Sequence, residues 1–236
     1  LASVLLCSAV TLLISLCGAG MFIVVEMKAR APLIRLSLFA DLRLSGSLAL
    51  TLLVTTVMMT TLVVGAFYLR RGLSLSPTVV GLVLSVGPSL AALGGVPAGR
   101  LVDRFGAQRV VPGALLGMVC GCGLLALLPM SFGLPAYVLP MTVIAGSYAL
   151  FQAANNTGLM AAVSQDQRGV VSALLGLARN LGLITGAAAM GAVFAVATGN
   201  PTQAPAGVIG SGMHITFGVG TALMVMALII SRMQTN

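Results

Sequence analysis

The chain has 236 residues, of which 58% are hydrophobic and only 7% charged, with 12 Lys and Arg against 4 Asp and Glu. Soluble domains carry roughly 25% charged residues, and disordered tails are polar and highly charged, so the composition excludes both classes. A mean hydropathy of +1.11 instead predicts an integral membrane protein. The net charge of +8 comes from basic residues in short breaks between apolar runs, so we predict no nucleic-acid partner.

Seven apolar runs are long enough to cross the lipid bilayer as helices, which need ~20 residues each. Barrel strands of about 9–11 residues are too short to account for them, so the fold is predicted to be an all-α polytopic membrane protein. The predicted spans cover residues 2–25, 46–69, 77–98, 110–130, 134–157, 170–197 and 207–231.

The first predicted span, residues 1–25, stands apart from the other six. The sequence opens at Leu1 inside an apolar run, so we expect a piece of a longer protein, and residues 1–25 lack the basic start of a secretory signal. In residues 26–45, apolar side chains recur every four positions between arginines. This spacing predicts a cytoplasmic linker, either an amphipathic helix at the headgroup level or a partly ordered segment. Residues 46–236 then form one six-helix unit.

The basic residues also predict how the spans are oriented. Nine of the 12 fall at alternate breaks and in the C-terminal tail, whereas Arg70 and Arg71 occupy the remaining breaks and Arg179 lies within a span. By the positive-inside rule, the breaks and tail that hold these nine basic residues face the cytoplasm. The piece is therefore expected to begin outside and end inside the cell, in the plasma (inner) membrane.

The spans lack the side chains that catalysis or metal binding would need. The four acids, Glu26, Asp41, Asp103 and Asp166, all fall at breaks, and no nucleotide-binding loop or nucleophile set is present. The four cysteines lie in apolar runs, far from the only histidine. We therefore predict a protein that is not an enzyme and that uses neither a metal nor a cofactor.

Polar side chains inside spans are costly and so point to function. Gln152 and Asn156 share one helix face, beside Asn155, and predict either a water-filled cavity or hydrogen bonds between helices. Arg179 lies eleven residues after Arg168, which is ~16 Å along a helix. We expect its side chain to face a cavity or to bond to backbone carbonyls.

The second predicted span is rich in threonine and methionine. Thr55 and Met59 are candidates for a promiscuous apolar pocket, although ordinary core packing is the better explanation for most residues of this span. Small residues recur on other spans at Gly113, Gly117 and Gly121 and at Gly182 and Gly186. These positions predict close contacts between helices.

The break after the third span reads GRLVDRFGAQR and carries a recognisable set of residues. The set comprises Gly99, Asp103, Arg104, Gly106 and Arg109. It resembles the signature G-x-L-x-D-R-x-G-x-[RK] of the major facilitator superfamily, which lies between the second and third helices of a six-helix half. In physical terms, Asp103 can cap a helix N-terminus, and Gly106 can supply a tight turn.

Further segments are similar to the fourteen-span drug:proton antiporter branch of that superfamily. They are the linker at residues 26–44, the outer loop at residues 68–81, and residues 168–182, which include Arg179. Arg70 departs from the pattern, which has a glutamine at this position of the outer loop.

The resemblance implies a C-terminal transporter half that exports drugs or antibiotics by alternating access, in exchange for protons. Its implied partners are a missing N-terminal half, a small amphipathic substrate, protons and the lipid bilayer. Any membrane-embedded acid for proton coupling would lie on that missing half. The alternatives are an uptake or metabolite transporter of the same superfamily, and a non-transporting membrane subunit. A retinal protein is disfavoured, because the only lysine, Lys28, is not in the last span.

Overall fold

The computed structural model describes Gly18, Met21, residues 41–199 and residues 204–235, and the secondary structure of this part is helical. Within it, six helices are long and apolar enough to cross a membrane. The prediction of an all-α polytopic fold is therefore confirmed. Apart from Gly18 and Met21, the first predicted span lies outside the described residues, as do most of the linker and Cys7 and Cys17.

Helices α2 to α8 form the six crossings, and the fifth crossing consists of α6 and α7 together. Their bounds are Leu42–Phe67 (α2), Pro77–Phe105 (α3), Ala107–Leu127 (α4), Pro135–Ala162 (α5), Arg168–Thr185 (α6), Gly191–Thr198 (α7) and Ala206–Thr235 (α8). A π-helical turn, Tyr68–Gly72, continues α2, and a second one, Gly186–Met190, joins α6 to α7.

Local sequence explains where several helices begin and end. Ser76 is the N-cap of α3, where its hydroxyl accepts a hydrogen bond from the Val79 amide, and Pro77 follows at the first helical position. Gly106, between α3 and α4, has φ of 80°, and Gly199, at the end of α7, has φ of 73°. Glycine adopts this left-handed region at little cost, so both breaks use the residue best suited to them.

The break between α3 and α4 is much shorter than the hydropathy pattern suggested. α3 runs on to Phe105 instead of ending near residue 98, and α4 begins at Ala107, so Gly106 alone separates them. The expected tight turn at Gly106 is confirmed. The expected cap from Asp103 is wrong: Asp103 lies inside α3, and the N-cap of α4 is Gly106, with no side-chain cap hydrogen bond. A charged residue ends an apolar run without ending the helix, and α3 accordingly continues through Arg100, Asp103 and Arg104.

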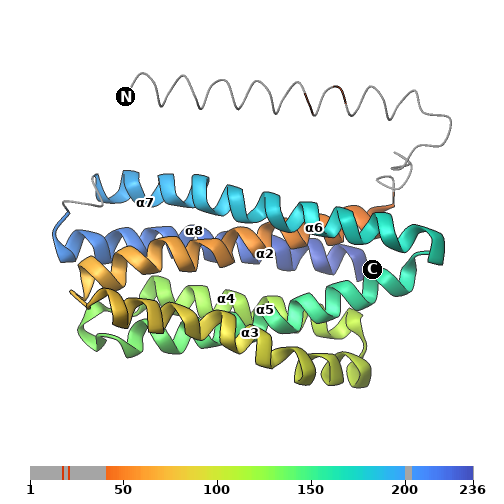
Figure 1. Cartoon of the computed structure of the whole chain (residues 1–236), viewed down its shortest axis with the longest axis horizontal. Helices are drawn as coiled ribbons and strands as arrows, with labels where there is room; N and C mark the ends of the chain where they lie inside the picture. The colour runs from red at the N-terminus through yellow and green to blue at the C-terminus, as the bar shows by residue number, and fades with distance from the viewer. Residues whose placement is uncertain (1–17, 19–20, 22–40, 200–203, 236) are drawn as a thin grey trace. The chain divides into compact units, whose positions relative to one another are not determined.

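The six crossings lie side by side in a bundle (Figure 1). α2 and α8 pack together in the middle, with α6 against α2 and α7 against α8 on one side, while α4 packs on both α5 and α8 on the other. α3 packs mainly against α5. The largest side chains of the core are fully buried aromatic rings, those of Tyr68, Tyr137, Phe151, Phe194 and Phe217.

The glycine-lined contacts predicted from the sequence are present at most of the expected places. A Cβ on Gly121 would press against Pro140 and Ile144 of α5, and one on Gly182 would overlap Thr55 of α2. Gly113, in contrast, has open space where its side chain would be. The small residues therefore serve the α4–α5 and α2–α6 contacts specifically.

The connections divide between the two ends of the bundle. The start of α2, the α3–α4 and α5–α6 connections and the end of α8 lie at one end, and the α2–α3 and α4–α5 connections, the end of α7 and the start of α8 lie at the other (Figure 1). Arg104, Arg109 and Arg168 belong to the first end, whereas Arg70 and Arg71 belong to the second. The bundle thus has one basic-rich end, as the alternating pattern of breaks predicts.

Candidate functional site

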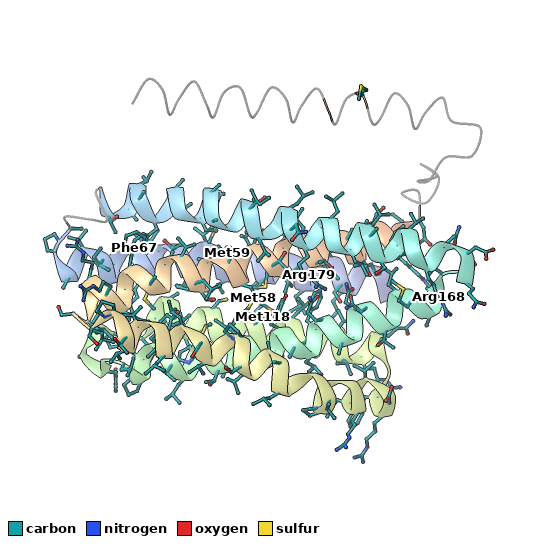
Figure 2. All side chains as sticks on the ribbon, in the orientation of Figure 1. Met58, Met59, Phe67, Met118, Arg168 and Arg179 are labelled. Carbon is teal, nitrogen blue, oxygen red and sulfur yellow. The ribbon has the colours of Figure 1, made fainter. Side chains whose placement is uncertain are left out.

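Arg179 is the one charged residue that α6 carries beyond its first turn. Figure 2 shows Arg179 well inside the bundle, far from the end at which Arg168 lies. Its side chain is half-buried. Because guanidinium stays protonated at any physiological pH, this position brings a permanent positive charge into a membrane-spanning segment.

The amide of Gln152 on α5 is the main hydrogen-bond partner of Arg179. A guanidinium only donates, so the Gln152 amide must turn its oxygen toward it. In that orientation Oε1 accepts from Arg179 Nη2 at 2.8 Å and Nε at 3.1 Å, and from the Tyr148 hydroxyl at 3.1 Å. Since α2 packs against both α5 and α6, the cluster of Tyr148, Gln152 and Arg179 connects two helices that flank a third.

Gln152 and Tyr148, the other two members of this cluster, are neutral, so the cluster retains a net positive charge. The described acids all lie at helix ends or in connections: Asp41 before α2, Asp103 in the last turn of α3, and Asp166 between α5 and α6. A fixed charge held by neutral hydrogen bonds, with all three side chains only half-buried, is suited to contact with water or a polar solute.

The structure separates the two asparagines that follow Gln152. Asn155 is buried, and its Nδ2 donates to Thr51 Oγ1 at 3.0 Å and to the Ser47 carbonyl at 3.5 Å, both on α2. Asn156 is half-buried, and its Oδ1 has no hydrogen-bond partner among the described residues. Asn155 therefore joins helices, whereas Asn156 offers a free acceptor.

An open hollow of about 420 Å³ lies at the surface beside Asn156, between α5 and the start of α6. Met160 of α5 and Arg168 of α6 also line it. Tyr148, Gln152, Asn156 and Met160 are spaced by four along α5, so they share one face. This face, with Arg179 at its inner end and Arg168 at its outer end, forms a polar track along α5 and α6.

Thr55 and Met59 lie on α2 at its contact with the α6 crossing. Thr55 is buried, and its hydroxyl donates to the Thr51 carbonyl of its own helix at 2.7 Å. Met59 is half-buried, and its Cβ lies beside Gly186. Thr55 and Met59 thus lie where α2 packs against the α6 crossing. They are not part of the polar track, whose residues come from α5 and α6.

The signature residues form the exposed corner between α3 and α4. Asp103, Arg104 and Arg109 are exposed there, and the Arg104 guanidinium lies 5.3 Å from the centroid of the Phe105 ring. Gly99 lies in the final turns of α3, and Gly106 makes the break. The structure therefore keeps this set together, at the basic-rich end and apart from the polar track.

Sequence reasoning missed Tyr148, although its position four residues before Gln152 was a usable signal.

The only histidine connects two helices: His214 Nε2 on α8 lies 2.9 Å from the Leu128 carbonyl at the end of α4, within hydrogen-bond distance. Among the described residues, no group of three or more His, Cys, Asp or Glu is placed to hold a metal ion.

Residues 2–187 and 46–235 each match the Major Facilitator Superfamily. The transporter YebQ of Escherichia coli (strain K12) is 33% identical over 122 residues, 52% of this chain and 27% of that protein. The riboflavin transporter RibZ of Clostridioides difficile (strain 630) is 28% identical over 129 residues, 55% of this chain and 28% of RibZ. The drug efflux pump JefA of Mycobacterium tuberculosis is 28% identical over 176 residues, 74% of this chain and 34% of JefA.

The matched part of the chain thus spans only 27 to 34% of the length of these relatives. The family match covers the six described crossings, including the Asp-Arg corner between α3 and α4. The chain belongs to the major facilitator superfamily, whose members are multi-pass membrane transporters of small substrates and not enzymes.

Proposed function

We propose that this chain is the C-terminal part of a proton-coupled exporter of drugs or antibiotics, in the fourteen-span branch of the superfamily. Residues 1–25 would be the last central span, residues 26–45 the cytoplasmic linker and residues 46–236 the six-helix half. An N-terminal half would complete the transporter, and the two halves would rock about a site near the membrane midplane.

The observation that carries this proposal is the hydrogen-bonded cluster of Tyr148, Gln152 and Arg179 on the polar track. It places a positive charge and two neutral polar groups at half-buried positions among the helices, and an open hollow lies beside Asn156, one turn of α5 farther along. Such groups inside a membrane are expensive, and they mark solute pathways in transporters. We assign Gln152, Asn156 and Arg179 to that pathway, with Thr55 and Met59 supporting its α2 side.

The drug-export part of the proposal is supported by similarity to pumps whose names state that activity. JefA is one, and the multidrug efflux pump LfrA of Mycolicibacterium smegmatis is 21% identical over 194 residues. The similarity to RibZ, a riboflavin transporter, supports metabolite transport as the second candidate. The four acids of the chain lie at helix ends or in the linker, so the proton-coupling acid would belong to the N-terminal half.

An accumulation assay tests the direction of transport and its energy source. The open reading frame that carries this sequence is expressed in bacteria that lack their own drug exporters, and a fluorescent amphipathic drug is measured inside the cells. We expect less drug than in cells with an empty vector, and a rise to the control level after a protonophore. Increased accumulation of the drug, or unchanged drug with altered riboflavin uptake, would reject drug export in favour of the second candidate.

A further inference from the structure

The charged side chains of the polar track are both positive. Arg179 and Arg168 carry these charges, and the other members of the track are neutral. Asp166, the nearest described acid along the chain, lies in the connection between α5 and α6 and does not line the hollow beside Asn156. Charges of like sign repel, so this track disfavours a cationic solute and favours an anionic one.

The guanidinium of Arg179 keeps one edge for a further acceptor. A guanidinium carries five N–H groups, on Nε, Nη1 and Nη2. With the Gln152 amide turned toward it, Oε1 accepts from Nη2 and Nε, so Gln152 occupies the edge that these two atoms form. These are the hydrogen bonds that Arg179 makes to described residues, and they leave Nη1 and the second N–H of Nη2. Such a pair of parallel donors matches the two oxygens of a carboxylate.

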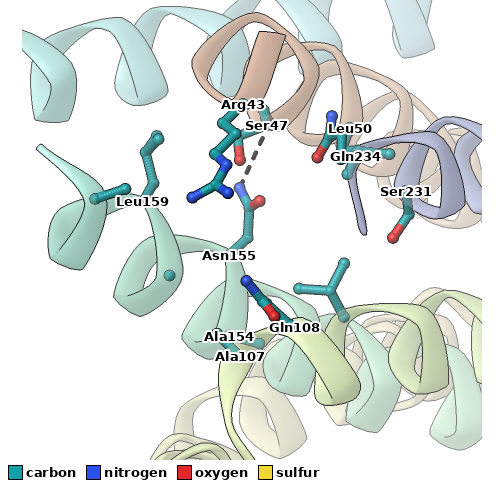
Figure 3. Close-up of a pocket in the computed structure, with 13 residues that line it drawn as sticks. Arg43, Ser47, Leu50, Ala107, Gln108, Ala154, Asn155, Leu159, Ser231 and Gln234 are labelled. Atoms are coloured by element: carbon teal, nitrogen blue, oxygen red, sulfur yellow. Dashed lines mark hydrogen bonds between the residues drawn. The ribbon is translucent and has the colours of Figure 1, made fainter. Parts of the chain in front are cut away.

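Asn156 adds a second polar group without a partner. Its Oδ1 is shielded from solvent and has no hydrogen-bond partner within the described part of the chain. Asn156 lines the hollow one turn of α5 beyond Gln152, a distance of ~6 Å along the helix. Asn155, in contrast, lines a separate pocket of about 110 Å³, where its Nδ2 donates to the Ser47 carbonyl at 3.5 Å (Figure 3). A buried acceptor without a donor costs free energy, which a donor group on a solute would offset.

We propose that the exported solute is an amphipathic organic acid whose carboxylate binds to the remaining edge of the Arg179 guanidinium. This inference rests on the proposed function and names its substrate class. Gln152 holds the guanidinium in place through hydrogen bonds that leave its charge unneutralised. The carboxylate supplies the missing negative charge, and a donor elsewhere on the solute bonds to Asn156.

A carboxylate of the N-terminal half is the alternative partner for the same edge. Arg179 would then hold the two halves together, and its loss would weaken the binding of every ligand to the same extent. The ratio of affinities for two ligands that differ only in a carboxylate therefore separates the two roles.

The test measures ligand binding by the protein that the whole open reading frame carrying this sequence encodes, purified in neutral detergent. The probes are dansylglycine, a carboxylate at neutral pH, and dansylglycinamide, which has the same scaffold and no charge, and dansyl fluorescence reports their binding. The variants are Arg179→Gln, which removes the charge, and Arg179→Lys, which keeps it. Arg71→Gln is the matched control, because Arg71 is exposed in the π-helical turn that continues α2.

We expect the unsubstituted protein to bind dansylglycine about tenfold more tightly than dansylglycinamide, the effect of about one charge-assisted hydrogen bond. Arg179→Gln should abolish this preference, Arg179→Lys should retain a preference for the acid, and Arg71→Gln should leave the ratio unchanged. Equal affinities for the two probes, no binding of dansylglycine, or an unchanged ratio in Arg179→Gln would overturn the proposal. An acid preference without export would reject the proposed function alone, and export without an acid preference would reject this inference alone.

Discussion

At the scale of single residues, hydrogen bonds between helices decide which polar side chains are structural. The Tyr137 hydroxyl of α5 donates to the Thr61 carbonyl of α2 at 2.7 Å, and its ring lies against Gly65. This bond is fully buried and joins two helices of the core. The Gln152–Arg179 bonds also join helices, but they lie at a half-buried site. The Tyr137–Thr61 bond should therefore matter for stability alone, whereas the Gln152–Arg179 bonds should matter for both stability and transport.

Tyr137→Phe should lower the free energy of unfolding by about 0.5–1.5 kcal/mol, because the Thr61 carbonyl already accepts a helical bond and loses only its second partner. Unfolding of the purified protein in detergent measures the change. Ser85→Ala is the control, since the Ser85 hydroxyl is exposed and bonds only to its own helix. Equal effects of the two substitutions would mean that the α2–α5 bond adds nothing.

Gln152→Leu and Arg179→Gln should have non-additive effects on unfolding, because each removes the same pair of hydrogen bonds. A coupling free energy of about 0.5–3 kcal/mol is expected from the double-mutant cycle. The cycle compares the two single variants with the double variant in one detergent. Strict additivity would show that the two side chains do not interact.

At the scale of helices, close contact of α2 with the α6 crossing depends on two glycines. A side chain at Gly182 would meet Thr55 and the Leu52 carbonyl, and one at Gly186 would meet the Thr56 carbonyl. The Thr56 hydroxyl lies 3.2 Å from the Gly182 carbonyl and donates to it across this contact. Membrane helices pack through small residues because lipid gives them no hydrophobic drive to associate.

Gly182→Ala should therefore destabilise the bundle by about 1–3 kcal/mol through overpacking. Gly176→Ala is the matched control, because it lies on the same helix and has open space at its Cβ. That change should be neutral or stabilising by up to about 1 kcal/mol, as alanine favours helix. The comparison is made by thermal unfolding, and the α2–α6 contact would be refuted if both variants melted alike.

The helices were predictable from sequence, whereas the polar pairings were not. Long apolar runs fix which segments span the bilayer, so all six described crossings match predicted spans. Hydropathy does not show how far a helix continues beyond its apolar run. The sequence therefore predicted a break from residue 99 to 109, whereas the structure has Gly106 alone between α3 and α4. Asn155 pairs with Thr51, 104 residues away, and Arg179 pairs with Gln152 on the preceding helix. Neither pairing follows from hydropathy, because each depends on how α5 and α6 pack around α2.

At the scale of the whole molecule, the segregation of arginines bears on orientation. We propose that the end with Arg104, Arg109 and Arg168 faces the cytoplasm and the end with Arg70 and Arg71 faces outward. Single cysteines introduced by Ser74→Cys and Ser164→Cys, both exposed positions in connections at opposite ends, test this in a cysteine-free background. A membrane-impermeant maleimide added to intact cells should label position 74 and spare position 164. The opposite labelling would invert the proposed topology.

We propose that the polar track of α5 and α6 carries the substrate. The most direct measurement compares drug export by Arg179→Gln and Arg71→Gln, expressed at equal levels in the membrane from the open reading frame that carries this sequence. Both variants lose one positive charge, but Arg179 is half-buried on the track (Figure 2), whereas Arg71 is exposed at the other end of α2. We predict at least a tenfold loss of export for Arg179→Gln, because the variant loses about one charge-assisted hydrogen bond. Export by Arg71→Gln should be near normal. Normal export by Arg179→Gln would contradict the assignment of the pathway to this face.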